Sequence, residues 1–308
     1  MTHHCADRLL AACERTGSLA CVGLDPRVAL LPETVRRDAL AAAGGGRSGV
    51  CAAFQAFNRG IIAAIAGRCP VVKPQVACYE AYGSAGMAVL EDTIMTARAA
   101  GLEVIVDGKR NDIGSTATHY REAWLTGPPG LDPGVEVAGA GGDWLTVNGY
   151  LGADGVRPLL DDPPGEHGVF VLVKTSNPGS AELQGQPSGE GTVMEVMARL
   201  VATWGHDRLG HCGLSDIGAV VGATWPDEAR TLREIMPETL FLVPGYGAQG
   251  GSAADALAGL RAQGDGVIIN ASRSIIGAGC GLEATADWRE VVRAALESMN
   301  ADIARARS

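Results

Sequence analysis

Eight short runs of apolar residues recur along the chain, each bounded by residues typical of turns. The runs are 19–25, 71–75, 103–109, 144–148, 168–175, 217–223, 240–245 and 266–272. Within each run the apolar residues are nearly continuous instead of alternating with polar ones. That pattern is typical of parallel strands buried on both faces of a sheet. The sequence therefore favours an α/β fold built on a parallel sheet.

Segments with helical spacing separate these runs. Phe54, Phe57 and Ile61 are spaced three and four residues apart, and the apolar residues of 193–201 follow the same period. Strands that alternate with helices imply right-handed βαβ units. Eight such units predict a (β/α)8 TIM barrel with loop insertions. A doubly wound open sheet is the alternative, and the strand count favours the barrel.

The chain has 308 residues, which would allow two domains at about 150 residues each. Because α/β barrels of about 250 residues form one domain, we expect a single TIM-barrel domain over 1–308. Glycine is frequent, with 43 of 308 residues against a usual share of about 7%. Many glycines fall in three stretches that we interpret as insertions, 127–142, 161–167 and 183–191. Their roles are left open.

Charge and composition exclude several classes of partner. The formal net charge is −10, so neither nucleic acid nor an anionic membrane surface is an expected partner. The longest uninterrupted apolar runs, such as 169–173, fall far short of the roughly 18 residues that cross a bilayer. The eight cysteines are scattered without a Cys-x-x-Cys pair, which is not a disulfide framework. With no apolar segment at the N-terminus, we expect a cytoplasmic protein.

Charged and polar side chains end almost every apolar run. In a barrel of this kind the active site lies at the carboxyl ends of the strands. Asp107 and Lys109 are two residues apart and should share one face of a strand. Lys73 ends the neighbouring strand, and Asp112 lies where the chain turns into a helix. These four groups could form a catalytic network of alternating charge, or a purely structural set of ion pairs.

The last two strands carry a separate signal. The stretch 245–251 is rich in glycine, and Arg273 follows the next run. Loops after the seventh and eighth strands often bind phosphate in this fold, and arginine contacts phosphate through two charge-assisted hydrogen bonds. The alternative is that these glycines only make a tight turn. The pairing with Arg273 favours a phosphate site.

Six segments at the ends of the apolar runs carry a further signal: 22–27, 72–75, 107–116, 175–177, 244–251 and 270–275. Together they resemble a known family, orotidine 5′-phosphate decarboxylase, and within it the longer bacterial branch (type 2). The Asp-x-Lys-x-x-Asp element is shared with related sugar-phosphate barrels, whereas all six segments in this order are highly specific. They run from residue 19 to about 277, nearly the whole chain.

The resemblance implies an enzyme that removes CO2 from orotidine 5′-monophosphate to give uridine 5′-monophosphate, the last step of de novo pyrimidine biosynthesis. It implies no metal and no organic cofactor, so preorganised protein charge must stabilise the carbanion. Lys109 matches the family's proton donor. Asp107 would lie near the departing carboxylate, and Lys73 would hold Asp107 and a ribose hydroxyl.

The resemblance also implies how the nucleoside monophosphate is bound. It implies a homodimer in which Asp112 reaches the partner's site. The expected substrate-binding residues are Asp25 (ribose), Ile113 and Thr116 (following Asp112), Ser176 (pyrimidine), Gln249 and Gly250 (pyrimidine to phosphate) and Arg273 (phosphate). Asn148 ends the fourth run without an assigned role.

Two other functions remain open at this point. The first is a magnesium-dependent sugar-phosphate decarboxylase or lyase of the same superfamily, although a metal site would favour a carboxylate where Lys73 stands. The second is a non-catalytic phosphate- or nucleotide-binding module, which requires the charged network to be structural. The pattern Gly44-x-Gly46-x-x-Gly49 fits a dinucleotide site only literally, because the residues before it read as helix instead of strand.

Overall fold

Eight parallel strands close into a barrel in this computed structural model, which describes residues 4–132, 134–135, 137–189, 191–247, 250–282 and 287–307. The predicted (β/α)8 barrel is confirmed, and the open-sheet alternative is wrong because β1 pairs with both β2 and β10. All eight strands fall on the predicted runs, and only β3 extends one residue beyond. The strands are β1 (Ala20–Leu24), β2 (Val71–Pro74), β3 (Glu103–Arg110), β4 (Trp144–Val147), β5 (Gly168–Lys174), β8 (Ile217–Val221), β9 (Phe241–Val243) and β10 (Val267–Ala271).

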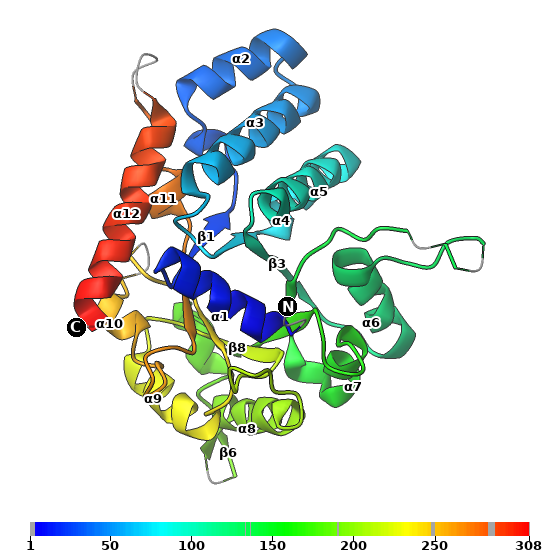
Figure 1. Cartoon of the computed structure of the whole chain (residues 1–308), viewed down its shortest axis with the longest axis vertical. Helices are drawn as coiled ribbons and strands as arrows, with labels where there is room; N and C mark the ends of the chain where they lie inside the picture. Colours follow the sequence, from blue (N-terminus) through cyan, green and yellow to red (C-terminus); the bar gives the residue numbers. More distant parts are fainter. Residues whose placement is uncertain are drawn as a thin grey trace.

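Helices surround the barrel, as the coiled ribbons of Figure 1 show. The α-helices are α1 (Cys5–Thr16), α2 (Glu33–Ala43), α3 (Arg47–Ile65), α4 (Val76–Glu80), α5 (Gly83–Ala99), α6 (Gly114–Arg121), α7 (Ala153–Val156), α8 (Val193–Gly205), α9 (Pro226–Ile235), α10 (Ala253–Ala256), α11 (Arg273–Ile276) and α12 (Trp288–Arg307). The short helical turns are η1 (Val28–Leu30), η2 (Glu122–Thr126), η3 (Gly149–Leu151), η4 (Arg157–Leu159) and η5 (Pro178–Glu182).

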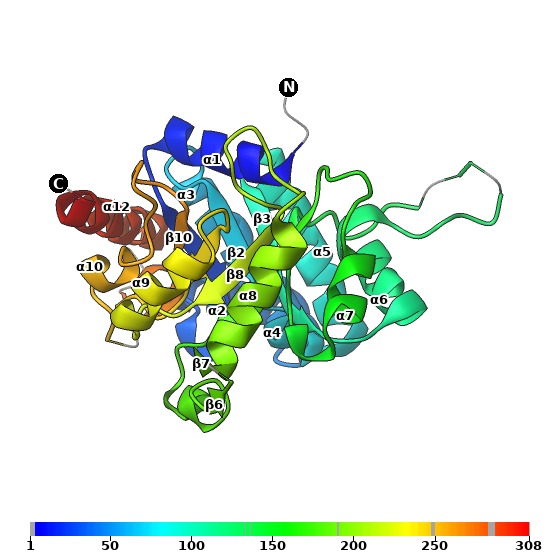
Figure 2. The ribbon, with the colours of Figure 1, turned by 90° about the horizontal axis from the view of Figure 1, so that it is seen from below.

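Apolar side chains on both faces of the strands are buried. Every residue of β1, β8 and β10 is buried. Inside the barrel wall Trp144 and Phe170 pack with ring centroids 4.7 Å apart. Helix α1 lies at one end of the barrel, opposite the end from which the small hairpin of β6 (Pro187–Ser188) and β7 (Gly191–Thr192) projects (Figure 2).

Among the described helices, only α3 is long and apolar enough to cross a membrane by length and composition. Its apolar side chains instead pack against other helices, and 61% of its most apolar 18-residue stretch is buried. Phe54 packs edge-on against Tyr82, and Phe57 packs against Trp288 of α12. A buried helix of a globular core has this composition, so α3 gives no support to a membrane span.

Two of the three predicted insertions have distinct shapes. The described residues of the 127–142 stretch form an arm that projects from the barrel beside α6 (Figures 1 and 2), and Gly130 donates its backbone N–H to the carbonyl of Val135. Leu131 and Val135 on this arm are exposed. The 183–191 stretch forms the β6–β7 hairpin beyond the end of β5. The hairpin is a separate two-stranded sheet, and among the described residues neither insertion adds a strand to the barrel sheet itself.

Candidate active site

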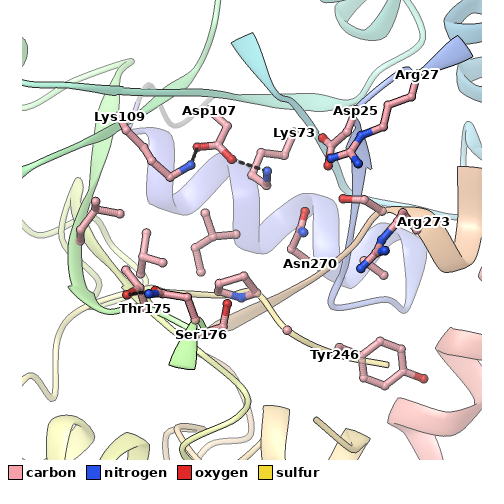
Figure 3. A pocket seen from close by; sticks show the side chains of 18 residues that line it. Asp25, Arg27, Lys73, Asp107, Lys109, Thr175, Ser176, Tyr246, Asn270 and Arg273 are labelled. Atoms are coloured by element: carbon pink, nitrogen blue, oxygen red, sulfur yellow. Dashed lines mark hydrogen bonds and ion pairs between the residues drawn. The ribbon is translucent and has the colours of Figure 1, made fainter. Parts of the chain in front are cut away.

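A cavity of about 620 Å³ opens at the carboxyl ends of the barrel strands. Figure 3 shows Lys109, Asp107 and Lys73 along one wall and Ser176 on the opposite wall. The predicted site residues that line it are Asp25, Lys73, Asp107, Lys109, Ser176 and Arg273. They come from β1, β2, β3, β5 and β10 or the residues that follow them, so the fold gathers groups that are up to 248 positions apart, from 25 to 273.

The Asp107 carboxylate forms the charged centre of this cavity. Its Oδ2 accepts a hydrogen bond from Lys73 Nζ at 2.5 Å, and its Oδ1 accepts one from Lys109 Nζ at 2.5 Å. Burial alone would raise the pKa of Asp107, but the ammonium groups of Lys73 and Lys109 outweigh it and hold the pKa well below its usual range. Burial opposes the charge of Lys73, yet Asp107 and Asp25 raise its pKa above its ordinary value. Asp107 and Lys73 are therefore both charged at neutral pH.

The backbone between Asp107 and Lys109 is not a regular strand. Val106 pairs with Leu145 and Arg110 with Val147, so residues 107–109 of β3 face one residue of β4. Lys109 lies at φ 45°, in the left-handed region that non-glycine residues rarely adopt. The two side chains meet, as their spacing predicts, but through a bulge. Bulges commonly re-aim side chains beside active sites.

Asp25 and Arg273 occupy the other end of the cavity (Figure 3). Asp25 follows β1, and its Oδ1 is buried without a hydrogen-bond partner in the described part of the chain. Arg273 begins α11 directly after β10 and has no carboxylate within 4.0 Å among the described residues. A buried acceptor and an unpaired guanidinium suit the hydroxyl groups and the phosphate of a sugar phosphate.

Ser176 lies on a loop whose preceding residue, Thr175, is hydrogen-bonded to the 183–191 insertion. Gln184 accepts the backbone N–H of Thr175 and donates to its hydroxyl, both at 2.9 Å. Trp225 donates its indole N–H to the Thr175 carbonyl at 3.1 Å. This insertion therefore holds the loop in place through Gln184.

Several predicted residues lie outside the cavity of their own chain. Asp112, Ile113 and Thr116 lie at the start of α6 and do not line it; Ile113 is 52% exposed. Gly250 does not line it either, although Gly245 and Tyr246 of the same glycine-rich stretch do. Gln249 falls outside the described residues.

Sequence reasoning assigned no role to several polar residues at the site, among them Gln75, Asn270 and Thr146. Gln75 donates to Asp107 Oδ2 at 2.9 Å. Asn270 is buried at the end of β10 with its amide group at the centre of the cavity (Figure 3), and its Oδ1 has no partner in the described chain. Gln75 and Asn270 both lie in strand-end segments, where a polar residue after an apolar run could have identified them as site residues. Thr146 is a polar residue inside an apolar run, a weaker signal. Asn148 instead accepts the backbone N–H of Tyr150 at 3.0 Å and caps η3.

The site presents positive charge around one buried carboxylate. The Asp107 oxygens accept hydrogen bonds from four donors among the described residues: two ammonium groups, one amide and one hydroxyl. Among the residues that the structure describes, no three His, Cys, Asp or Glu side chains are grouped to hold a metal ion. The arrangement suits an anionic ligand whose developing negative charge faces Lys109.

Comparison with known proteins gives consistent matches. The model of the "Orotidine 5′-phosphate decarboxylase / HUMPS family" matches residues 20–287. An orotidine 5′-phosphate decarboxylase of Rhodopirellula baltica is 45% identical over 302 residues, covering 96% of this chain and 97% of that one. The solved structure of Leishmania donovani OMP decarboxylase is 30% identical with a TM-score of 0.73, covering 100% and 99% of the two chains. L. donovani UMP synthase is 32% identical with a TM-score of 0.77, and the match covers 99% of this chain but only 57% of that longer one.

Proposed function

This chain belongs to the orotidine 5′-phosphate decarboxylase / HUMPS family, and from that membership and the geometry of the site we propose that it converts orotidine 5′-monophosphate into uridine 5′-monophosphate and CO2. The reaction is the last step of pyrimidine nucleotide synthesis. The observation that carries the proposal is the Lys73–Asp107–Lys109 network at the mouth of the barrel.

The chemistry follows from the charges of this network. The bond between C6 of the pyrimidine and its carboxylate carbon breaks, CO2 leaves, and the electron pair stays on C6. The Lys109 ammonium lies beside that carbon, stabilises the developing charge and then gives it a proton. Asp107 lies near the substrate carboxylate and disfavours the bound substrate relative to the transition state. Water returns the proton to Lys109, so the enzyme is unchanged.

The rest of the cavity orients the nucleotide. Arg273 binds the phosphate, Asp25 accepts a ribose hydroxyl, and Ser176 contacts the pyrimidine. Gln249 and Gly250 close over pyrimidine and phosphate from the glycine-rich stretch. The phosphate is remote from C6, but its binding energy fixes the reacting geometry.

The proposal includes a homodimer with shared sites. Asp112, Ile113 and Thr116 do not line the cavity of their own chain, which leaves them available to a second copy. Ile113 and Tyr150 are exposed apolar side chains beyond the ends of β3 and β4, 52% and 74% exposed, and suit a protein interface. In the dimer Asp112 completes the partner's site.

We also propose that residues 1–308 work as one barrel domain in the cytoplasm. The terminal helices α1 and α12 both pack against the barrel, since their inner faces are buried. The eight cysteines all lie in the described chain, and each is a free thiol. Free thiols are typical of proteins in a reducing compartment.

The experiment that tests the proposal follows the absorbance of orotidine 5′-monophosphate with purified protein in EDTA. We expect turnover by the wild-type chain and at least a 1,000-fold loss in Lys109→Ala, because both the proton donor and its charge are removed. Lys109→Ala should keep the wild-type melting temperature. Activity that disappears in EDTA would favour the magnesium-dependent alternative. Binding of uridine 5′-monophosphate without turnover would favour the non-catalytic module.

A further inference from the structure

One buried hydroxyl joins the two charged residues of the bulge. Thr146 lies in the middle of β4 and is 1% exposed. Its Oγ1 accepts the backbone N–H of Lys109 at 3.0 Å and donates to Asp107 Oδ1 at 2.8 Å. Asp107 Oδ1 is also the atom that accepts Lys109 Nζ. A single hydroxyl therefore contacts the backbone of one catalytic residue and the carboxylate of the other.

The position of Thr146 in the sheet explains why a side chain makes these contacts. It is the one residue of β4 that faces the three-residue bulge 107–109, between the pairs Val106–Leu145 and Arg110–Val147. The bulge interrupts the backbone ladder, so the part-buried N–H of Lys109 needs an acceptor other than a carbonyl of β4. The Thr146 hydroxyl supplies it.

The conformation of Lys109 makes this support consequential. A φ of 45° is unfavourable for a residue with a Cβ, and it persists only where surrounding contacts hold it. Lys109 is held by the Thr146 hydroxyl at its backbone N–H and by the Asp107 carboxylate at its ammonium. A valine has nearly the same shape as threonine but offers no acceptor and no donor.

We propose that Thr146 is a positioning residue for the decarboxylation: its hydroxyl fixes the left-handed backbone of Lys109 and the rotamer of Asp107, so that the ammonium is held at the carbon that receives the proton. This inference rests on the proposed role of Lys109. Thr146 does not line the cavity and acts through the other two residues.

The test compares Thr146→Ser, Thr146→Ala and Thr146→Val with the wild-type chain. We expect kcat to fall by about 10- to 100-fold in the alanine and valine variants, because a displacement of about 1 Å costs that much. KM and the inhibition constant for uridine 5′-monophosphate should change far less, because the phosphate and ribose contacts remain. Thr146→Ser keeps the hydroxyl and should stay within a few-fold of the wild-type kcat.

The serine–alanine pair keeps the proposal falsifiable if the valine variant does not fold, since the two differ by one oxygen atom. Thr203→Ala, at an exposed threonine of α8, is the matched control. An unchanged kcat in Thr146→Ala, or an equal loss in Thr146→Ser, would overturn the positioning role. Turnover by Lys109→Ala would instead overturn the proposed mechanism itself, so the two failures are distinguishable.

Discussion

The ammonium nitrogen of Lys109 lies 2.5 Å from Oδ1 of Asp107, yet the Lys109 side chain is 47% exposed and that of Asp107 only 7%. The carboxylate is thus fixed in the barrel wall, while the ammonium extends from it into the cavity. A ligand that enters the cavity meets the Lys109 ammonium, whose position is fixed by its ion pair with the buried Asp107. This relationship lets one residue hold the charge in place while the other remains accessible to the substrate.

Replacing the central carboxylate should affect both activity and stability. In Asp107→Asn we expect turnover to fall at least 100-fold, since the ammonium of Lys109 loses its fixed partner. The buried Lys73 also loses its counter-charge, which costs about 3–5 kcal/mol in the free energy of unfolding at pH 7. Because folding lowers the pKa of Asp107, this stabilisation is present above the unfolded pKa and is lost as the pH falls.

Urea unfolding at pH 7 and pH 3 checks the stability arm of that prediction. The gap between wild type and Asp107→Asn should be large at pH 7 and smaller at pH 3. Asp92→Asn, which removes an exposed pairing with Arg59 on α3, serves as the control at both pH values. A gap that stays constant with pH would contradict the assigned charge state of Asp107.

Replacing Arg273 should weaken binding of the substrate phosphate without affecting the decarboxylation step itself. In Arg273→Ala we expect kcat/KM for orotidine 5′-monophosphate to fall about 10- to 100-fold, since a hydrogen-bonded contact to a charged group contributes about 1.5–3 kcal/mol. Orotidine, which lacks the phosphate, should be turned over equally by variant and wild type. Steady-state kinetics with both substrates measures the difference. Arg37→Ala, an exposed arginine of α2, is the control. Equal losses on both substrates would place Arg273 elsewhere in the mechanism.

The sequence was sufficient for the barrel because the strands are short, apolar and separated by helical segments. It was also sufficient to predict that Lys73, Asp107 and Lys109 lie together, because the strand ends of a barrel converge on one cavity. It was not sufficient to predict the hydrogen bonds that Thr146 and Gln184 make at the site. Their roles depend on which residue of a neighbouring strand or insertion lies opposite a given N–H, and that pairing follows from the bulge and from loop conformation. Neither leaves a periodic signal in the chain.

The 183–191 insertion should contribute to pyrimidine binding through one side chain. Gln184→Leu removes both hydrogen bonds to Thr175 and frees the loop that carries Ser176. Each lost hydrogen bond is worth about 1 kcal/mol, so we expect KM to rise several-fold, with a smaller change in kcat. Kinetic assays compare it with Gln186→Leu, an exposed residue of the same insertion. If both variants behave alike, the insertion does not support the site through Gln184.

Stability should also depend on pH through Glu103 at the start of β3. Burial, together with the neighbouring Asp143, raises the pKa of Glu103 to about 7 despite its pairing with Arg8. Because the folded pKa lies above the unfolded one, the contribution of Glu103 to stability is greatest at low pH and declines as the pH rises to about 7. Relative to Glu103→Gln, the wild type should lose stability between pH 5 and pH 8, by an amount on the order of 1 kcal/mol. Urea unfolding at the two pH values measures this, and a wild type that gained stability relative to Glu103→Gln from pH 5 to pH 8 would contradict it.

A shared site makes a specific prediction for mixed subunits. Lys109→Ala and Asp112→Asn should each be inactive as pure proteins. When they are unfolded together and refolded, half of the dimers contain one subunit of each kind. In these, one site carries both substitutions, whereas the other combines an intact Lys109 with the partner's intact Asp112. About a quarter of the wild-type activity should therefore return, as two-fold symmetry requires.

The control for this experiment mixes Lys109→Ala with Asp107→Asn. Both substitutions alter residues that line the cavity of their own chain, so every site in a mixed dimer keeps one defect and no activity should return. Absorbance assays on the refolded mixtures, with the dimer fraction measured by light scattering, distinguish the cases. Activity that stays absent in the Lys109→Ala and Asp112→Asn mixture, although mixed dimers form, would show that Asp112 acts within its own subunit.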